Sequence, residues 1–172
     1  MRKKGFTLIE MTIVVAILGI LLSIAYMNFT KSIINSRLDS ATSEIASMLR
    51  DVYENGNKSM DYNTHYVKIS KNEGTYRIEL IKKEGNERVI RSAEYKDINI
   101  NFYIEENENN KSKIEFRDVN FIFFTSEGGL KVKYSLNEDG QEINLIQISN
   151  KSENNSKRVY IDKIPAGNIR VE

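Results

Sequence analysis

The sequence predicts an α+β protein in which one long N-terminal α-helix packs on a C-terminal antiparallel β-sheet domain. Two patterns lead to this prediction. Apolar residues recur at helical spacing, with no intervening Pro, from about Phe6 to about Tyr53. From Thr64 onward, apolar and polar residues alternate at the period of a strand. A chain of 172 residues has room for one modest domain and an appendage.

The first half of the expected helix is apolar. Arg2, Lys3 and Lys4 form a short basic head, and residues 11–30 are an uncharged run close to the length that spans a bilayer as a helix. Basic residues mark the cytoplasmic side of a span, so we expect the chain beyond Lys31 to lie outside the cytoplasm. Glu10 stands at the edge of this run, where a carboxylate usually has a partner or a function.

The second half of the helix is amphipathic. It carries a stripe of apolar residues at spacings of three and four: Ile34, Leu38, Ala41, Ile45, Met48 and Val52. We expect this stripe to pack on a folded domain, and we expect Asn55-Gly56-Asn57 to end the helix. The chain then divides into residues 1–5, a transmembrane helix at 6–30, an amphipathic helix at 31–56 and an antiparallel β globular domain at 57–172.

The rest of the chain alternates between strand and turn signals. The turns are rich in Gly and Asn, and residues 105–113 and 150–157 are expected to be solvated loops. The expected strands are residues 66–69, 76–80, 88–90, 98–104, 114–116, 121–124, 130–134, 143–148, 159–161 and 169–171.

The segment Gly5-Phe6-Thr7-Leu8-Ile9-Glu10 resembles the cleavage and methylation motif of type IV pilins and pseudopilins. The resemblance implies that residues 1–5 are a prepilin leader, that a prepilin peptidase cuts after Gly5, and that the new N-terminal Phe6 is N-methylated. It gives Glu10 a role in assembly and makes the apolar helix the core of a filament. Many pilins have a Pro eight residues after the position of Gly19, where this chain has Met27, which puts local unwinding of the helix in doubt.

A second pattern lies in the C-terminal third. Phe123-Phe124-Thr125-Ser126-Glu127-Gly128-Gly129, followed by a strand pair and by Gly167-Asn168-Ile169-Arg170-Val171, is similar to the minor pseudopilins of the GspH/FimT type. An ordinary β-meander with Gly turns explains the same pattern equally well.

Composition argues against an enzyme. The chain has no Cys and a single histidine, His65, which excludes Cys/His metal clusters, and no phosphate loop or nucleophile–base pair is present. We therefore expect no catalytic residues, no metal and no cofactor. Without residues 1–5, which include three basic and no acidic residues, 22 basic and 24 acidic residues remain, for a net charge of −2. That charge makes nucleic acid an unexpected partner.

The two resemblances imply a minor pilin or pseudopilin of a type IV pilus or a type II secretion pseudopilus. Its expected partners are other pilin subunits, the prepilin peptidase, the cytoplasmic membrane and the assembly machinery. The precursor would cross the cytoplasmic membrane once, with its N-terminus in the cytoplasm, and the mature chain would leave it within the filament.

Three alternative functions are compatible with the sequence. The first is a DNA-binding minor pilin for DNA uptake that uses the basic pairs Lys131/Lys133 or Lys157/Arg158, although a solvated strand face explains these pairs too. The second is an unrelated, uncut single-span protein. The third is a secretory signal cleaved after Ser23-Ile24-Ala25, but the charge before the apolar core and the apolar residues beyond Ala25 disfavour it.

Overall fold

The computed structural model describes residues 7–107, 110–163 and 167–172. Two compact units divide the chain, Met1–Ser36 and Arg37–Glu172. The predicted α+β class is confirmed, since a long helix, α1 (Leu8–Ser59), precedes a series of strands. Within the described residues these strands are β1 (His65–Asn72), β2 (Thr75–Glu84), β3 (Asn86–Lys96), β4 (Ile98–Asn107), β5 (Asn110–Ile114), β6 (Val119–Phe124), β7 (Leu130–Lys133), β8 (Gln141–Ile143), β9 (Leu145–Asn150), β10 (Ser156–Asp162) and β11 (Asn168–Val171).

The helix ends later than the sequence suggested. The stop expected at Asn55-Gly56-Asn57 is wrong, because α1 continues to Ser59. Gly56 is buried, and a Cβ there would come within 2.6 Å of Tyr62 Cδ1, so Gly56 serves close packing rather than termination. The helix stops instead at Met60, whose positive φ of 54° is the left-handed conformation that follows many helix ends.

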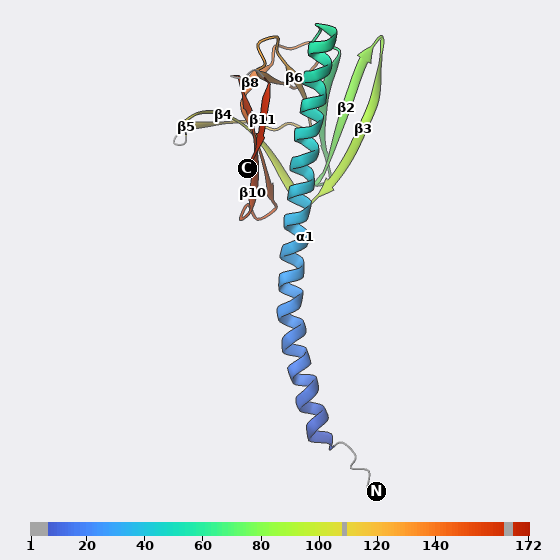
Figure 1. Cartoon of the computed structure of the whole chain (residues 1–172), viewed down its shortest axis with the longest axis vertical. Coiled ribbons are helices and arrows are strands. Elements are labelled where there is room, and N and C mark those ends of the chain that lie inside the picture. The colour runs from blue at the N-terminus through green and yellow to red at the C-terminus, as the bar shows by residue number, and fades with distance from the viewer. Residues whose placement is uncertain (1–6, 108–109, 164–166) are drawn as a thin grey trace. The chain divides into compact units, whose positions relative to one another are not determined.

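The strands form two antiparallel sheets. The first has the order β3-β2-β1-β6-β7-β8 and the second β11-β10-β9-β4-β5. In Figure 1 the long β2–β3 hairpin and the β10–β11 hairpin lie on different sides of the second half of α1. Because every pairing is antiparallel, neighbouring strands can be joined by short turns.

The core of the second unit is built on the amphipathic half of α1. Five residues of the expected stripe, from Leu38 to Val52, are buried in one cluster with apolar residues of both sheets, among them Ile78 and Ile148. The sixth stripe residue, Ile34, belongs to the first unit and is 36% exposed. Full burial of an aliphatic side chain contributes roughly 1.5–3 kcal/mol, so the stripe accounts for much of the attachment of this half of α1 to the sheets.

The strand expected at residues 143–148 is in fact two strands. Asn144 separates β8, in the first sheet, from β9, in the second. Its side-chain oxygen accepts a hydrogen bond from the Glu105 backbone N–H at 2.8 Å, and its amide donates to the Glu105 carbonyl at 2.6 Å. An Asn side chain that replaces backbone partners in this way lets the chain leave one sheet and enter the other.

The prediction of a loop at residues 105–113 is also wrong, as far as the structure describes these residues. β4 continues to Asn107 and β5 begins at Asn110, so this segment is a hairpin arm. Glu105 lies opposite Lys111 across the pair, and their charged atoms are 2.7 Å apart. Cross-strand pairs of opposite charge stabilise such a hairpin. The high content of polar residues suggested a loop because it does not show that these residues pair across two strands.

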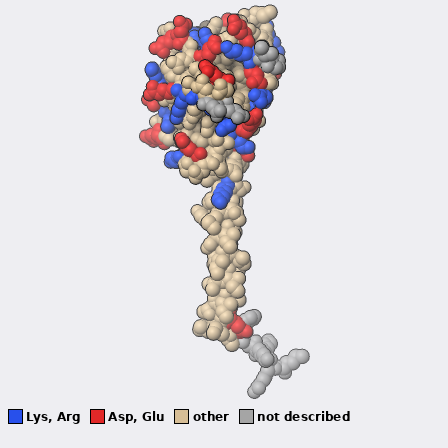
Figure 2. Space-filling model, turned by 90° about the vertical axis from the view of Figure 1, so that its left-hand side faces the viewer, with Lys and Arg blue, Asp and Glu red and all other residues tan. Residues whose placement is uncertain are grey.

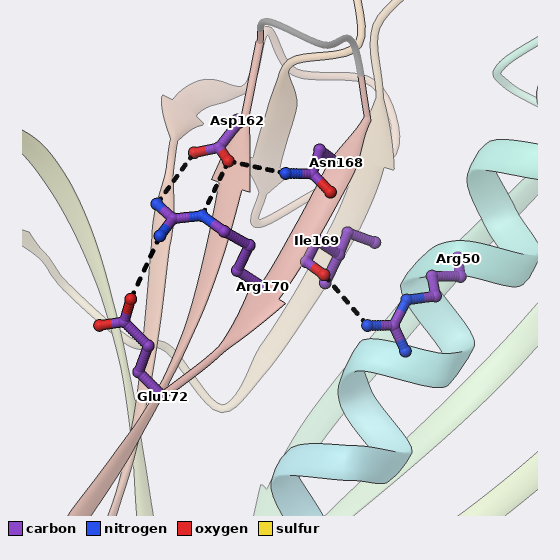
Figure 3. Close-up of polar contacts among 6 residues, drawn as sticks. All are labelled: Arg50, Asp162, Asn168, Ile169, Arg170 and Glu172. Atoms are coloured by element: carbon purple, nitrogen blue, oxygen red, sulfur yellow. Dashed lines mark hydrogen bonds and ion pairs between the residues drawn. The ribbon is translucent and has the colours of Figure 1, made fainter.

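The C-terminal hairpin is fastened to the helix (Figure 3). Arg50 on α1 donates a hydrogen bond to the Ile169 carbonyl of β11 at 3.0 Å. Within the hairpin, Arg170 and Asn168 both donate to Asp162 at 2.9 Å, and the Arg170 guanidinium lowers the pKa of that carboxyl below its ordinary value. Gly167, which directly precedes the hairpin's return strand β11, has a φ of 68° and lies against the ring of Tyr53, where a Cβ would overlap the ring.

This packing predicts the effect of adding one methyl group. Gly167→Ala should lower the free energy of unfolding by about 2–4 kcal/mol, because it combines a left-handed backbone with a clash against Tyr53. Gly74→Ala is the matched control, since Gly74 has a φ of 78° but open space around its Cα, and it should cost only about 1 kcal/mol. Urea unfolding of the full chain in detergent, followed by tyrosine circular dichroism, measures both. Equal losses would show that the contact with Tyr53 contributes nothing.

Candidate functional site

The candidate site lies at the start of α1. Of the three residues that sequence analysis assigned to it, Gly5 and Phe6 fall outside the described residues. Glu10 lies in the first turn of α1, with its side chain exposed. The structure therefore gives a geometry for the residue expected to act in assembly, and the cleavage and methylation positions remain predictions from the sequence.

Glu10 and Thr7 form a reciprocal pair of hydrogen bonds. The Thr7 backbone N–H donates to Glu10 Oε2 at 2.8 Å, and the Glu10 N–H donates to Thr7 Oγ1 at 3.3 Å. The Thr7 hydroxyl also donates to Oε2 at 2.8 Å. This arrangement is a capping box, in which the residue before the first helical turn and the third residue of that turn satisfy each other's N–H groups.

The capping box fixes where the carboxylate lies. All three bonds within this pair use Oε2 or the Thr7 hydroxyl, and no described residue hydrogen-bonds to Oε1. One oxygen is thus held by the helix start while the other is open to a cation. The role of Thr7 was not predicted, although the pattern Thr7-Leu8-Ile9-Glu10 before an apolar run is the sequence signature of a capping box.

Behind the capping box, residues 8–30 present an apolar surface. The most apolar 18-residue window of α1 has a mean hydropathy of 2.6, so α1 is long and apolar enough to cross a membrane. None of that window is buried by the residues that the structure describes. Ile9, Val15 and Leu22 are each at least 66% exposed. In Figure 2 this stretch is tan apart from acidic atoms near its start, whereas both signs of charge are interspersed over the visible face of the other unit. Such a surface requires lipid or other apolar helices around it.

The Ser and Thr hydroxyls in this stretch bond to carbonyls of their own helix. Ser23 Oγ donates to the Gly19 carbonyl at 2.8 Å, and Thr30 Oγ1 lies 3.1 Å and 3.0 Å from the carbonyls of Tyr26 and Met27. Hydroxyls satisfied in this way do not need water, which suits a lipid or helix-bundle environment. α1 is helical throughout, including Gly19 and Met27.

Other sequence candidates are satisfied locally or stand apart from this site. His65 opens β1, is 8% exposed, and has a ring nitrogen 3.0 Å from Thr64 Oγ1; burial lowers its pKa. Lys157 pairs with Asp39 at 3.2 Å, and Arg158 lies against the Tyr160 hydroxyl at 3.5 Å. Among the described residues, no group of three or more His, Cys, Asp or Glu side chains is placed to hold a metal ion.

Comparison with known proteins identifies the N-terminal segment. Residues 1–26 match the family model described as the prokaryotic N-terminal methylation motif, which is the prepilin signature of type IV pilins and pseudopilins. The match covers the capping box and most of the apolar run. No curated protein and no solved structure matches the chain.

The capping box gives a prediction about Thr7. Thr7→Val removes the hydroxyl that accepts the Glu10 N–H, so the Glu10 amide proton should exchange with solvent several-fold faster than in the wild type. Thr7→Ser keeps the hydroxyl and should exchange like the wild type. Amide exchange by NMR on the full chain in detergent micelles measures the difference. Identical rates in all three proteins would show that the capping box does not persist in solution.

Proposed function

We propose that this chain, which begins with a prepilin signature and continues as an exposed apolar helix, is a minor subunit of a type IV pilus or of a secretion pseudopilus. The motif and the helix support a pilin-type structural subunit rather than an enzyme. They also fit a membrane-anchored precursor. The assignment to a minor subunit is our own extension of these findings.

The observation that supports assembly most directly is the surface of residues 8–30. It is apolar, uncharged between Glu10 and Lys31, and no described residue of the chain covers it. In the precursor, lipid would cover this surface. After transfer to a filament, the equivalent helices of neighbouring subunits would replace the lipid, since the two environments are similarly apolar.

The residues of the motif acquire distinct roles in this proposal. Cleavage after Gly5 would leave Phe6 with a new amine, one residue before the capping Thr7. Glu10 would then offer Oε1 to the amine of its own or a neighbouring chain, while Thr7 holds Oε2. A carboxylate that enters an apolar bundle needs such a cation, because an unpaired charge there is strongly unfavourable.

A minor rather than a major role is favoured by the C-terminal pattern shared with the GspH/FimT type. Two residues of that pattern meet at the same point of the helix. The Phe124 ring centroid is 5.1 Å from that of Tyr53, and Gly167 lies against the same Tyr53 ring. The shared contact with Tyr53 supports the interpretation that these residues of the pattern pack together, and that the pattern is not merely a set of turns that contain Gly by chance.

Processing gives the first test. Gly5→Leu should leave residues 1–5 attached, because a side chain at the cut site would prevent close approach of the peptidase to the backbone. Gly19→Ala is the control, since Gly19 has open space around it and lies outside the cleavage segment. Intact-mass measurement of both variants from producing cells decides the matter. A Gly5→Leu protein that still starts at Phe6, or a wild type that starts at Tyr26, would disprove prepilin processing.

Assembly gives the second test, and two substitutions of Glu10 separate charge from capping. Glu10→Gln keeps an acceptor suitable for a capping box but removes the negative charge, whereas Glu10→Ala removes both. If the carboxylate pairs with an amine, both variants should insert into membranes normally and be depleted from sheared filaments. Fractionation of cells that carry each variant as the sole copy measures this. Normal recovery of Glu10→Gln in filaments would limit Glu10 to a capping role.

A further inference from the structure

A second candidate site lies in the globular unit, far along the chain from the capping box. A cavity of about 330 Å³ forms where the segment after α1 meets the β6–β7 hairpin. Its lining includes the polar and charged side chains of Asp61, Asn63, Thr125, Ser126, Lys131 and Lys133. The volume is within the range of cavities that hold small ligands.

The two lysines lie on the outer face of the first sheet. In β6 and β7, Ile122, Phe124, Leu130 and Val132 belong to the main core on α1, while Phe123 belongs to a separate cluster with Tyr66 and Ile81. Lys131 is opposite Phe123 and Lys133 is opposite Phe121, so alternation places both lysines on the face away from the helix. Two positions apart on one strand, they are about 7 Å from each other at the Cα atoms.

Neither lysine of the cavity is held in an ion pair with a described residue. Glu142 lies opposite Lys131 across the β7–β8 pair and interacts with its charge, but the Glu142 carboxylate is bonded to Lys163 at 2.7 Å. Lys133 Nζ lies 5.3 Å from the centroid of the Phe123 ring, which holds it near the cavity. The acid in the lining, Asp61, already accepts a hydrogen bond from the Asn63 N–H at 2.9 Å.

The walls of the cavity are preformed. The Thr125 hydroxyl accepts a hydrogen bond from the Gly129 N–H at 3.0 Å, and the Thr125 carbonyl accepts one from the Gly128 N–H at 3.0 Å. Beneath the lysines, Phe123 packs on Tyr66, which is completely buried, at a centroid distance of 4.8 Å. A rigid wall and floor lower the entropic cost of binding.

We propose that this cavity binds an oxyanion carried on a small hydroxylated ligand, such as a phosphorylated or carboxylated sugar. Lys131 and Lys133 would receive the oxyanion, because a mobile ammonium suits phosphate and carboxylate oxygens. The Asn63 amide and the Ser126 hydroxyl would bond the ligand's hydroxyl groups. This role goes beyond filament assembly and does not depend on it, since every residue involved lies in the globular unit.

The same surface is less suited to nucleic acid. Phe123 is 7% exposed, so its ring is not free to stack on a base, and stacking supplies much of the affinity for single strands. The mature net charge of −2 would also oppose a long polyanion. Neither the need for base stacking nor the repulsion of a long polyanion applies to a ligand of one or two sugar units.

Calorimetric titration of the full chain in detergent micelles tests the proposal with glucose 6-phosphate, glucuronate, glucose and inorganic phosphate. The preferred anionic sugar should bind at least about tenfold more tightly than glucose or phosphate alone. The affinities for glucose 6-phosphate and glucuronate show whether the site prefers a phosphate or a carboxylate group. In the double variant Lys131→Gln/Lys133→Gln, that affinity should fall at least about tenfold.

The matched control is Lys96→Gln/Lys113→Gln, which removes the same charge from exposed positions on β3 and β5 and should bind like the wild type. Thermal unfolding of each variant verifies that the fold is retained. Equal affinity for glucose and the anionic sugars, or no difference between the two double variants, would overturn the proposal. The proposal would also be overturned, in favour of a nucleic-acid site, if a single-stranded oligonucleotide bound more tightly than either anionic sugar at physiological salt. That binding would have to disappear in Lys131→Gln/Lys133→Gln.

Discussion

Burial of the apolar stripe of α1 between two sheets is the interaction on which the globular unit depends. Leu38, Ile45 and Met48 are each at most 2% exposed, and they contact strands that would otherwise have no common core. Neither sheet can cover its inner face alone, since an antiparallel sheet must bury one face on another layer. Arg50 and Tyr53, further along the helix, secure the C-terminal hairpin to the same layer.

The same helix presents two different surfaces because its sequence changes halfway. Residues 8–30 are apolar on all sides, so no single face of the chain can cover them, and they require a surrounding apolar medium. The capping box of Thr7 and Glu10 completes this design at the helix start. It provides hydrogen-bond acceptors for N–H groups at the helix start, where no preceding turn supplies carbonyl groups. It also orients the one carboxylate beside the apolar run.

The outer face of the first sheet shows how local pattern and tertiary position combine. Alternation alone puts Lys131 and Lys133 on one side of a strand, which is the usual pattern of a solvated surface. The fold adds the residues after α1 and the rigid turn at Thr125, and so turns part of that surface into a cavity. Residues 60–63 and 131–133 are distant in sequence, and no local signal relates them.

The sequence by itself determined the fold class, the long helix, most strands and the N-terminal motif, because these depend on periodicity and on local chemistry within a few residues. Only the tertiary structure decided that the strands form two sheets, that Asn144 carries the chain between them, and that residues 105–107 and 110–113 form a hairpin arm. It also decided that Gly56 lies inside the helix, packed against Tyr62. Each of these outcomes depends on a partner brought close by folding, and a polar or flexible residue looks the same in sequence whether it meets water or such a partner.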